Sequence, residues 1–352
     1  MNKIDKKFWK YKKVLITGSS GFKGTWLVEF LKNLSCDVYG ISNSKKKSTL
    51  DQSKKFFFLN ICKKNKLYKV INFIKPEIIF HLAAQPIVMT SYKKPDDTFN
   101  TNISGLINLL EIIKNMDCVK STVIVTSDKC YKVDDHKVFN LSEKSHLGGN
   151  DPYSASKACA EIISNSYYFS YFKNFKKKKG LATARAGNVV GGGDKSKNRI
   201  IPDIINSILN KKNIYIRRPH NTRPWQHVLD VVYGYILLAE NLYKKPKFFS
   251  GAWNFASSSK KEITVLNLVK YFCKDMSYKK KIIFYESDIH EEKSYKISSK
   301  KSKKYLGWKP MYSAKNSILL TSHWYKNFIY DKISPQQLTQ NQVIQYLNLL
   351  KI

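Results

Sequence analysis

Three glycines near the N-terminus limit most strongly what this chain can fold into. They lie in the segment Thr17-Gly18-Ser19-Ser20-Gly21-Phe22-Lys23-Gly24, after the apolar run 14–17 and before the amphipathic stretch 25–34. Glycines let the backbone turn tightly after a strand, and the N-terminus of the next helix offers free N–H groups to a phosphate. The segment therefore predicts a dinucleotide-binding turn.

Apolar runs and amphipathic stretches alternate through the first half of the chain. We predict strands at 14–17, 37–41, 56–61, 77–82, 123–126 and 182–186, and helices at 25–34, 66–74, 98–114, 153–171 and 199–209. This alternation is typical of a parallel sheet covered on both faces, in which ligands bind at the carboxyl ends of the strands. We therefore predict an α/β fold with a Rossmann-type doubly wound parallel sheet. Residues 1–190 would form the dinucleotide-binding domain, and 191–352 a smaller α/β substrate-binding region with segments that return to the sheet.

Composition limits the class of protein further. The 352 residues are 43% hydrophobic and 13% aromatic, which is enough for a large buried core. No apolar run reaches the roughly 18 residues that span a bilayer, and the basic segment 1–13 has no apolar signal core. The six cysteines include no C-x-x-C pair, so no metal site is predicted. We expect a cytoplasmic protein without membrane association.

The formal net charge of +36, from 62 Lys and Arg against 26 Asp and Glu, is large enough to suit a nucleic-acid binder. The lysines, however, are spread along the chain, with short runs at 45–47 and 176–179 and no single basic helix or arm. Lys, Asn, Ile, Tyr and Phe are abundant together, as an A/T-rich coding sequence would produce. We therefore expect no nucleic-acid partner, and keep a basic nucleic-acid-binding Rossmann protein as a remote alternative.

Five polar residues lie in two places that we expect to be close together: three follow the predicted strand 123–126, and two lie at the start of the predicted helix 153–171. Ser127, Asp128 and Lys129 come directly after the strand, and Tyr153 and Lys157 are four residues apart. Because positions i and i+4 share one face of a helix, Lys157 would hold a positive charge near the phenol. That charge would lower the tyrosine pKa from its ordinary value of about 10. Such a tyrosine suits removal of a proton from a sugar hydroxyl while hydride leaves the same carbon.

Residues at the strand ends are candidates for the cofactor site. Beyond Tyr153 and Lys157, the predicted set is Gly18, Ser20, Gly21, Phe22, Lys23, Gly24, Asn60, Ile61, Leu82, Ala83 and Ala84. An acid often holds the NAD ribose at the end of the second strand, but here Ser42 and Asn43 are followed by Lys45–Lys47. We expect NAD and leave NADP open, since these lysines could meet a 2′-phosphate.

A second polar cluster spans residues 217–228, where Arg, His, Gln and Trp are dense. Arginine forks suit the phosphates of a nucleotide diphosphate, and an aromatic ring suits its base. A solvated loop with one core tryptophan is the alternative interpretation, and we favour binding.

The chain resembles the extended short-chain dehydrogenase/reductase family over nearly its whole length. The resemblance rests on the glycine turn together with His81-Leu82-Ala83-Ala84-Gln85-Pro86, Thr126-Ser127-Asp128-Lys129-Cys130-Tyr131, Tyr153-Ser154-Ala155-Ser156-Lys157 and Arg223-Pro224-Trp225-Gln226-His227-Val228. Within this family the chain is similar to the nucleotide-sugar 4,6-dehydratases. Ser127-Asp128-Lys129 resembles the CDP-glucose branch, because the dTDP-glucose and GDP-mannose branches usually carry Glu at the position of Lys129.

The resemblance implies an NAD-dependent hydro-lyase that converts CDP-D-glucose to CDP-4-dehydro-6-deoxy-D-glucose and water, for deoxysugar and O-antigen-type polysaccharide synthesis. Tyr153, assisted by Lys157 and Ser127, would remove the proton from the 4-hydroxyl. Lys129 would act as the base at carbon 5, and Asp128 would protonate the departing 6-hydroxyl.

By the same resemblance, the substrate-side candidates are Gln85, Asn188, Arg199, Arg223, Gln226 and His227. The resemblance also implies a homodimer or a dimer of dimers, formed by helices 98–114 and 153–171. Another nucleotide-sugar dehydratase or a nucleotide-sugar 4-epimerase is the alternative activity. An epimerase has no use for the acid–base pair Asp128-Lys129, so that pair argues against it.

Overall fold

The glycine turn is the first crossover of a parallel sheet in the computed structural model of the protein. The structure describes residues 3–44, 55–133, 140–173, 179–196, 198–257, 263–285 and 296–352. Lys45–Lys47, the lysines that left NADP open, lie outside the described residues.

The main sheet has seven strands, all parallel, in the order β12-β7-β5-β4-β1-β2-β3. Their bounds are β1 Lys13–Thr17, β2 Asp37–Ser42, β3 Phe56–Phe58, β4 Ile78–His81, β5 Ser121–Val125, β7 Gly180–Arg185 and β12 Gly251–Asn254. Each predicted strand is present, although β3 is shorter than predicted. The edge strand β12 comes from beyond residue 190, so the second half of the chain contributes to this sheet. The domain boundary at 190 stays a prediction.

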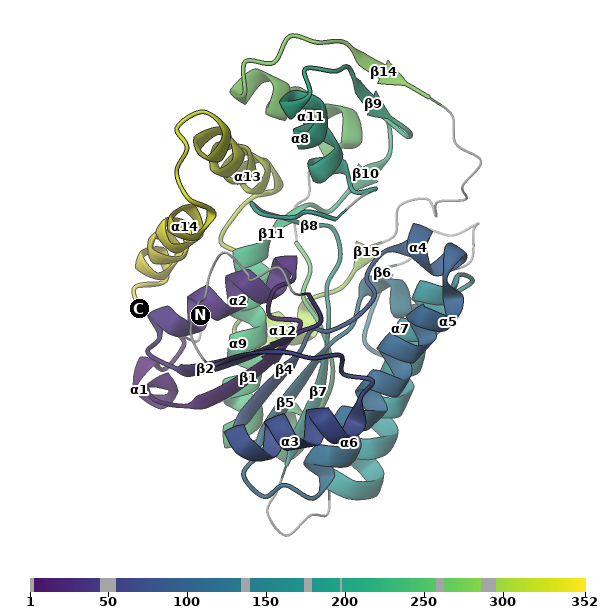
Figure 1. The fold of residues 1–352 in the computed structure, drawn as a ribbon, viewed down its shortest axis with the longest axis vertical. Coiled ribbons are helices and arrows are strands. Elements are labelled where there is room, and N and C mark those ends of the chain that lie inside the picture. Colours follow the sequence, from purple (N-terminus) through teal and green to yellow (C-terminus); the bar gives the residue numbers. More distant parts are fainter. Residues whose placement is uncertain are drawn as a thin grey trace.

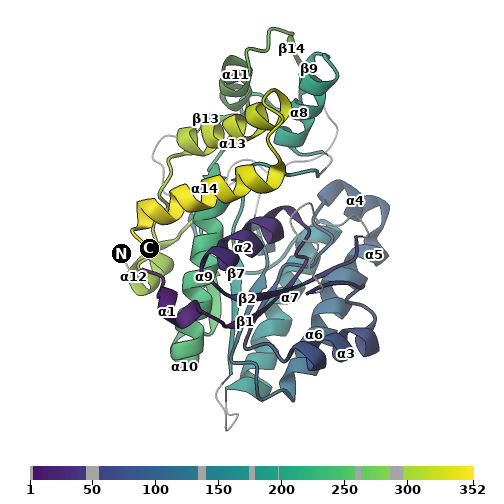
Figure 2. The same ribbon diagram turned by 60° about the vertical axis from the view of Figure 1, so that its left-hand side comes forward.

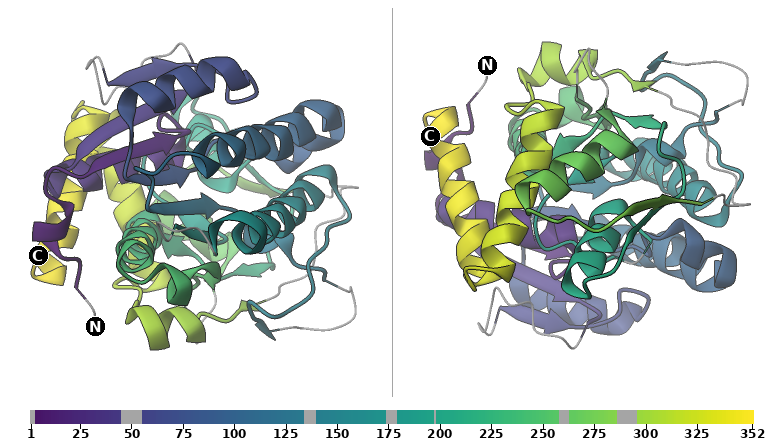
Figure 3. Two further views of the ribbon diagram at one scale, coloured as in Figure 1. Left: turned by 90° about the horizontal axis from the view of Figure 1, so that it is seen from below. Right: turned by 90° about the horizontal axis from the view of Figure 1, so that it is seen from above.

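Helices cover both faces of the sheet, as Figure 1 and the end-on views in Figure 3 show. One face carries α3 (Lys64–Ile74), α6 (Gly105–Lys114) and α7 (Pro152–Tyr167), and the other carries α2 (Phe22–Asn33) and α9 (Val228–Lys244). Alternate strand residues point to opposite faces. Leu15 and Ile79 therefore join the apolar core under α3 and α6, whereas Val14 and Ile78 join the core under α2 and α9. The predicted α/β Rossmann fold is confirmed.

Two predicted helices contain π-helical turns. The stretch predicted as one helix over 98–114 consists of α5 (Pro95–Phe99), a π-helical turn (Asn100–Ser104) and α6. Similarly, α7 ends in a π-helical turn, Tyr168–Phe172. Asn102 lies inside the first π turn, is buried, and donates to Ser156 Oγ of α7 at 2.8 Å. The π turn thus brings a polar side chain to a neighbouring helix.

Pro202 does not interrupt the helix that was predicted at 199–209. Helix α8 runs unbroken from Ile200 to Leu209 with Pro202 inside its first turn. The first N–H groups of a helix have no intrahelical partner, so a proline there removes nothing that the helix uses.

A smaller lobe lies beyond the carboxyl ends of the sheet strands (Figure 1). It is built from α8, α11 (Val265–Asp275), β8 (Val189–Val190), β9 (Ile214–Ile216), β10 (Thr222–Arg223), β11 (Gln226–His227), β13 (Ile263–Thr264) and β14 (Ile282–Phe284). The remaining elements are α1 (Lys6–Trp9), α4 (Val88–Lys93), β6 (Asn140–Leu141), α10 (Pro246–Phe249), β15 (Lys296–Ile297), α12 (Lys300–Leu306), α13 (Ala314–Ile329) and α14 (Pro335–Leu350). Helix α14 packs along α2, as Figure 2 shows.

One buried carboxylate attaches the C-terminal segments to α9. Asp230 accepts hydrogen bonds from the Met311 and Tyr312 backbone N–H groups, at 2.7 and 3.3 Å, and from Tyr346 Oη at 2.7 Å. Burial raises the pKa of Asp230 from 3.8 to about 6, against the lowering effect of these three hydrogen bonds. A carboxyl whose pKa is raised on folding stabilises the fold at low pH, and that contribution is lost as pH rises through 6.

We therefore expect a pH-dependent difference between the native protein and an Asp230→Asn variant. The free energy of unfolding of the native protein minus that of the variant should fall by roughly 1–1.5 kcal/mol between pH 5 and pH 7.5. Urea unfolding at both pH values measures it. A difference that is constant, or that grows with pH, would contradict the raised pKa.

Candidate functional site

The glycine turn passes the end of β4 at very short range. Gly18 has φ +73°, and a Cβ built on it would lie 2.7 Å from the Ala83 backbone nitrogen. A Cβ on Gly24 would lie 2.2 Å from the Gly18 carbonyl oxygen. Only glycine fits both positions, and the 12-residue helix α2 begins at Phe22 with its free N–H groups at this turn. The cradle fits the pyrophosphate of a dinucleotide.

Gly18→Ala should weaken NAD binding at least about tenfold, because it adds a left-handed strain of about 1–3 kcal/mol and a clash with β4. Isothermal titration of NAD measures the loss. Gly251→Ala is a matched control, since Gly251 also has a positive φ but a Cβ there would meet nothing within 4 Å. Unchanged NAD affinity in Gly18→Ala would rule out this cradle.

The other predicted cofactor residues line the same edge of the sheet. Ser20 hydrogen-bonds Ser42 at the end of β2. Asn60 is exposed and its side-chain oxygen accepts from the Cys62 N–H at 2.9 Å, while Ile61 packs on Gly105. Hydroxyl and amide groups, with no carboxylate among the described residues 42–44, are what this edge offers a ribose.

Ser127, Asp128 and Lys129 lie in a short turn at the carboxyl end of β5, which we call the 127–131 turn. Ser127 caps it: Ser127 Oγ accepts from the Lys129 N–H at 3.2 Å and donates to Asp128 Oδ1 at 2.9 Å. Tyr153 is in the first turn of α7, and it lines the same cavity as Ser127, Asp128 and Lys129. The structure therefore brings the predicted catalytic residues from β5 and α7 together.

Burial shifts the pKa values of Tyr153 and Lys157 in ways that the sequence did not predict. The pKa of Tyr153 is raised by burial, against the lowering effects of the Ser127 hydrogen bond and of the Arg199 charge. The prediction that the Lys157 charge lowers the pKa of Tyr153 below its ordinary value was therefore wrong for the protein without a bound cofactor. The Lys157 Nζ lies 5.9 Å from the Tyr153 ring centroid and donates to the Val125 carbonyl at 3.4 Å. Burial also lowers the pKa of Lys157 to about 8, although the Glu161 carboxylate opposes that shift.

A cavity of about 690 Å³ opens from the 127–131 turn toward the smaller lobe. Among the predicted substrate residues, Asn188, Arg199 and Arg223 line it, together with Ser127, Asp128, Lys129 and Tyr153. Arg199 Nη1 lies 3.3 Å from Asp194 Oδ2, and Arg223 Nη1 donates to the Thr222 carbonyl at 3.0 Å. Lys23 of the glycine turn also lines the cavity, and burial lowers its pKa to about 8.

Three predicted substrate residues do not line this cavity. Gln85 uses its side-chain amide within its own loop, donating to the Ile87 carbonyl and Thr98 Oγ1 and accepting from the Ile87 N–H. Gln226 is buried and donates to the Gly187 and Phe255 carbonyls. His227 is fully buried, accepts from the Leu229 N–H at 3.3 Å as the cap of α9, and has its pKa lowered to about 3 by burial. Gln226 Oε1 and His227 Nε2 are buried without a hydrogen-bond partner among the described residues, and the substrate roles of these three residues stay predictions.

Sequence reasoning also missed residues that line the cavity. Arg217 lies in the polar cluster 217–228 without having been singled out there, and Asp194, Met89 and Tyr92 had no predicted role. Asp194 ends the glycine-rich run after β7, and Arg217 directly follows β9, so position after a strand was the signal that could have identified both.

Neither a metal site nor a membrane-spanning helix occurs among the described residues. Within the described ranges, no group of His, Cys, Asp and Glu could hold a metal ion. No helix in that part of the chain has the length and apolar character to cross a membrane.

A model of the GDP-mannose 4,6 dehydratase family matches residues 15–320. The chain belongs to this family. It is 38% identical over 349 residues to a CDP-glucose 4,6-dehydratase of Salmonella typhimurium, covering 93% of this chain and 94% of the relative.

Solved structures share the fold of this dehydratase-family chain. A UDP-glucose 4-epimerase of Thermotoga maritima, in a structure with UDP-glucose, is 22% identical with a TM-score of 0.79, covering 90% of this chain and 99% of the epimerase. A dTDP-glucose 4,6-dehydratase of Bacillus anthracis, in complex with NAD, is 23% identical with a TM-score of 0.70, covering 90% of this chain and 97% of that one. At these identities the likeness establishes the fold alone.

Proposed function

We propose that this protein is an NAD-dependent CDP-glucose 4,6-dehydratase, a hydro-lyase that forms CDP-4-dehydro-6-deoxy-D-glucose and water. The observation that carries the proposal is the meeting of an acid, a lysine and a tyrosine, Asp128, Lys129 and Tyr153, on one cavity next to the dinucleotide cradle. The 38% identity to the Salmonella enzyme over nearly the whole chain supports the same activity.

Each side chain has a task in this proposal. Tyr153 takes the proton of the sugar 4-hydroxyl, assisted by Ser127 on the same cavity. Lys129 removes the proton at carbon 5, which a ketone at carbon 4 makes acidic, and Asp128 protonates the 6-hydroxyl as it leaves as water. The proposed phosphate contacts are Arg199 and Arg223, together with Arg217 as a third arginine on the cavity.

The cofactor is proposed on the fit of its site. The cradle at Gly18 and Gly24 accommodates a pyrophosphate, and Lys157 would hold a positive charge beside the bound nicotinamide ribose and Tyr153. Bound NAD would supply a hydride acceptor that is regenerated within each turnover.

The test is incubation of the purified protein with CDP-glucose and a catalytic amount of NAD, followed by alkali treatment that reveals a 4-keto-6-deoxy sugar by its absorbance. Parallel reactions contain dTDP-glucose and GDP-mannose, and a parallel series replaces NAD with NADP. Product from CDP-glucose alone is the expected result. Product only from another nucleotide sugar would keep the chemistry and overturn the substrate.

A 4-epimerase is the second candidate, because removal of the 4-hydroxyl proton by Tyr153 beside Ser127 would begin an epimerisation as well. An epimerase would interconvert two hexoses and release no water. Detection of that interconversion, without a 4-keto-6-deoxy product, would assign Asp128 and Lys129 another role.

Oligomeric state and setting belong to the proposal as well. Three large apolar side chains, Ile162, Phe169 and Tyr171, are about half exposed along α7 and its π-helical extension. We propose that this face forms a homodimer together with α6, which light scattering would test, with Ile162→Asp as the disrupting variant. We also propose a cytoplasmic enzyme that supplies a deoxysugar for polysaccharide synthesis, testable by cell fractionation and by the polysaccharide of a deletion strain.

A further inference from the structure

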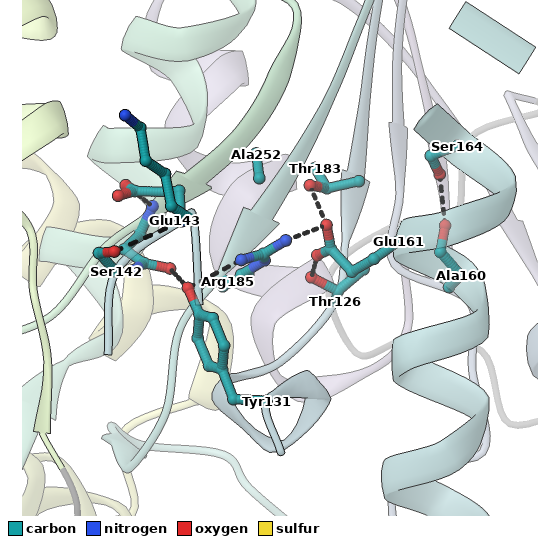
Figure 4. Close-up of polar contacts among 12 residues, drawn as sticks. Thr126, Tyr131, Ser142, Glu143, Ala160, Glu161, Ser164, Thr183, Arg185 and Ala252 are labelled. Carbon is teal, nitrogen blue, oxygen red and sulfur yellow. Dashed lines mark hydrogen bonds and ion pairs between the residues drawn. The ribbon is translucent and has the colours of Figure 1, made fainter. Parts of the chain in front are cut away.

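Glu161 joins three parts of the fold behind the 127–131 turn. It is buried on α7, one helical turn beyond Lys157. Its Oε1 accepts from Thr126 Oγ1 at 2.5 Å, and its Oε2 accepts from Thr183 Oγ1 at 2.6 Å and from Arg185 Nη2 at 2.7 Å (Figure 4). Thr126 directly precedes the turn, so Glu161 holds the entry of the turn to the helix that carries Tyr153.

Arg185 holds the exit of the same turn. Its Nη1 donates to Tyr131 Oη at 2.8 Å, and its guanidinium carbon lies 4.8 Å from the Tyr131 ring centroid (Figure 4). Tyr131 Oη in turn donates to Asn254 Oδ1 on β12 at 2.8 Å. Tyr131 is the last residue of the turn, so both of its ends are bonded to one buried ion pair.

The catalytic acid is also confined from the side. A Cβ on Gly187 would lie 2.0 Å from Asp128 Oδ2, so Asp128 packs against the backbone two residues beyond Arg185. Entry, exit and acid are therefore all fixed by the segment around Arg185 and by its partner Glu161.

The two buried charges of Glu161 and Arg185 indicate that this ion pair has a role besides stabilising the fold. Glu161 and Arg185 are each 3% exposed, and burying two charges costs desolvation that their attraction only partly offsets. Arg185 Nε moreover has no hydrogen-bond partner in the described part of the chain. An apolar pair could pack this space, but it could not bond a threonine at one end of the turn and a tyrosine at the other.

We propose that Glu161 and Arg185 are a positioning pair, which fixes the 127–131 turn relative to Tyr153 and so sets the rate of water elimination without touching the substrate. The inference rests on the proposed function, because it assigns elimination to Asp128 and Lys129. A misplacement of about 1 Å at a reacting group can cost a factor of about 10² in rate.

The chain provides a matched pair of variants. Thr126→Val and Thr183→Val each remove one buried threonine hydroxyl from Glu161 with little change of shape, but only Thr126 adjoins the turn. We expect single-turnover elimination to slow by about 10–100-fold in Thr126→Val. It should stay near the native rate in Thr183→Val, although both variants lose similar stability. Thr126→Ser, which keeps the hydroxyl, should restore elimination, and Tyr131→Phe should slow it from the other end.

Two readouts separate positioning from general destabilisation. In single turnovers, reduced nicotinamide should persist longer in Thr126→Val than in Thr183→Val, because elimination follows hydride removal. Amide hydrogen exchange of the protein alone should be faster at residues 127–131 in Thr126→Val and Tyr131→Phe, and unchanged there in Thr183→Val. This second readout needs neither substrate nor cofactor.

The outcomes are distinguishable. If the native protein forms no 4-keto-6-deoxy sugar from any nucleotide sugar, the proposed function fails. The hydrogen-exchange experiment would still test whether Glu161 and Arg185 fix the 127–131 turn. If the native protein is active and Thr126→Val and Thr183→Val behave alike in both readouts, the positioning role of Glu161 and Arg185 is overturned.

Discussion

Replacing Tyr153 with Phe should lower kcat for CDP-glucose by about 10²–10⁴-fold, the range expected for loss of a general base. The phenol is buried beside Ser127 on the cavity, and burial raises its pKa, so a bound cofactor would have to lower that pKa before the tyrosine could act as a base at neutral pH. Because Phe keeps the ring, the KM and the stability should change little. Steady-state formation of the 4-keto-6-deoxy sugar measures the effect.

Tyr68→Phe is the control for this change. Tyr68 is also on a helix, α3, but it is half exposed and does not line the cavity. Near-native turnover in Tyr153→Phe would move the base elsewhere and would remove the main reason for placing the chemistry at α7.

Lys129→Met should reduce net dehydration by a similar factor, on the order of 10²–10⁴, but by a different route. Lys129 lines the cavity in the 127–131 turn, whereas Tyr153 stands on α7, so the first step should survive. Removal of hydride from carbon 4 would proceed and elimination would not. The absorbance of reduced nicotinamide should therefore rise and persist when the variant is mixed with CDP-glucose and NAD.

The control for Lys129→Met is Lys132→Met, an equal loss of charge at an exposed position just beyond the turn. It should leave both phases of the reaction unchanged. Full turnover in Lys129→Met would show that the base at carbon 5 is another group. Loss of the first phase as well would show that Lys129 acts in substrate binding.

Most of the sheet was predictable because its determinants are local. A buried parallel strand is a short apolar run, and Gly18 and Gly24 occupy positions where any Cβ would overlap backbone, so their spacing already defines the turn. Tyr153 and Lys157 were predictable for the same reason, since four residues on a helix define one face.

The substrate side was less predictable because its residues share one kind of sequence and meet different surroundings. Arg223, Gln226 and His227 lie within five positions of each other, yet only Arg223 lines the cavity. Gln226 and His227 turn into the core, where Gln226 donates to the Gly187 carbonyl and His227 caps the start of α9. No local pattern distinguishes these uses.

By itself, the sequence determined the order of strands and helices, the dinucleotide turn and the catalytic residue types, because each depends on periodicity or on spacing over a few residues. Tertiary structure alone decided that β12 closes the sheet edge, that burial raises the pKa of Tyr153, and that Glu161 and Arg185 bond both ends of the 127–131 turn. Those features depend on desolvation and on contacts between segments 20 to 130 residues apart, such as the 2.8 Å bond between Tyr131 and Asn254. Pairings over such separations are set by how the layers pack.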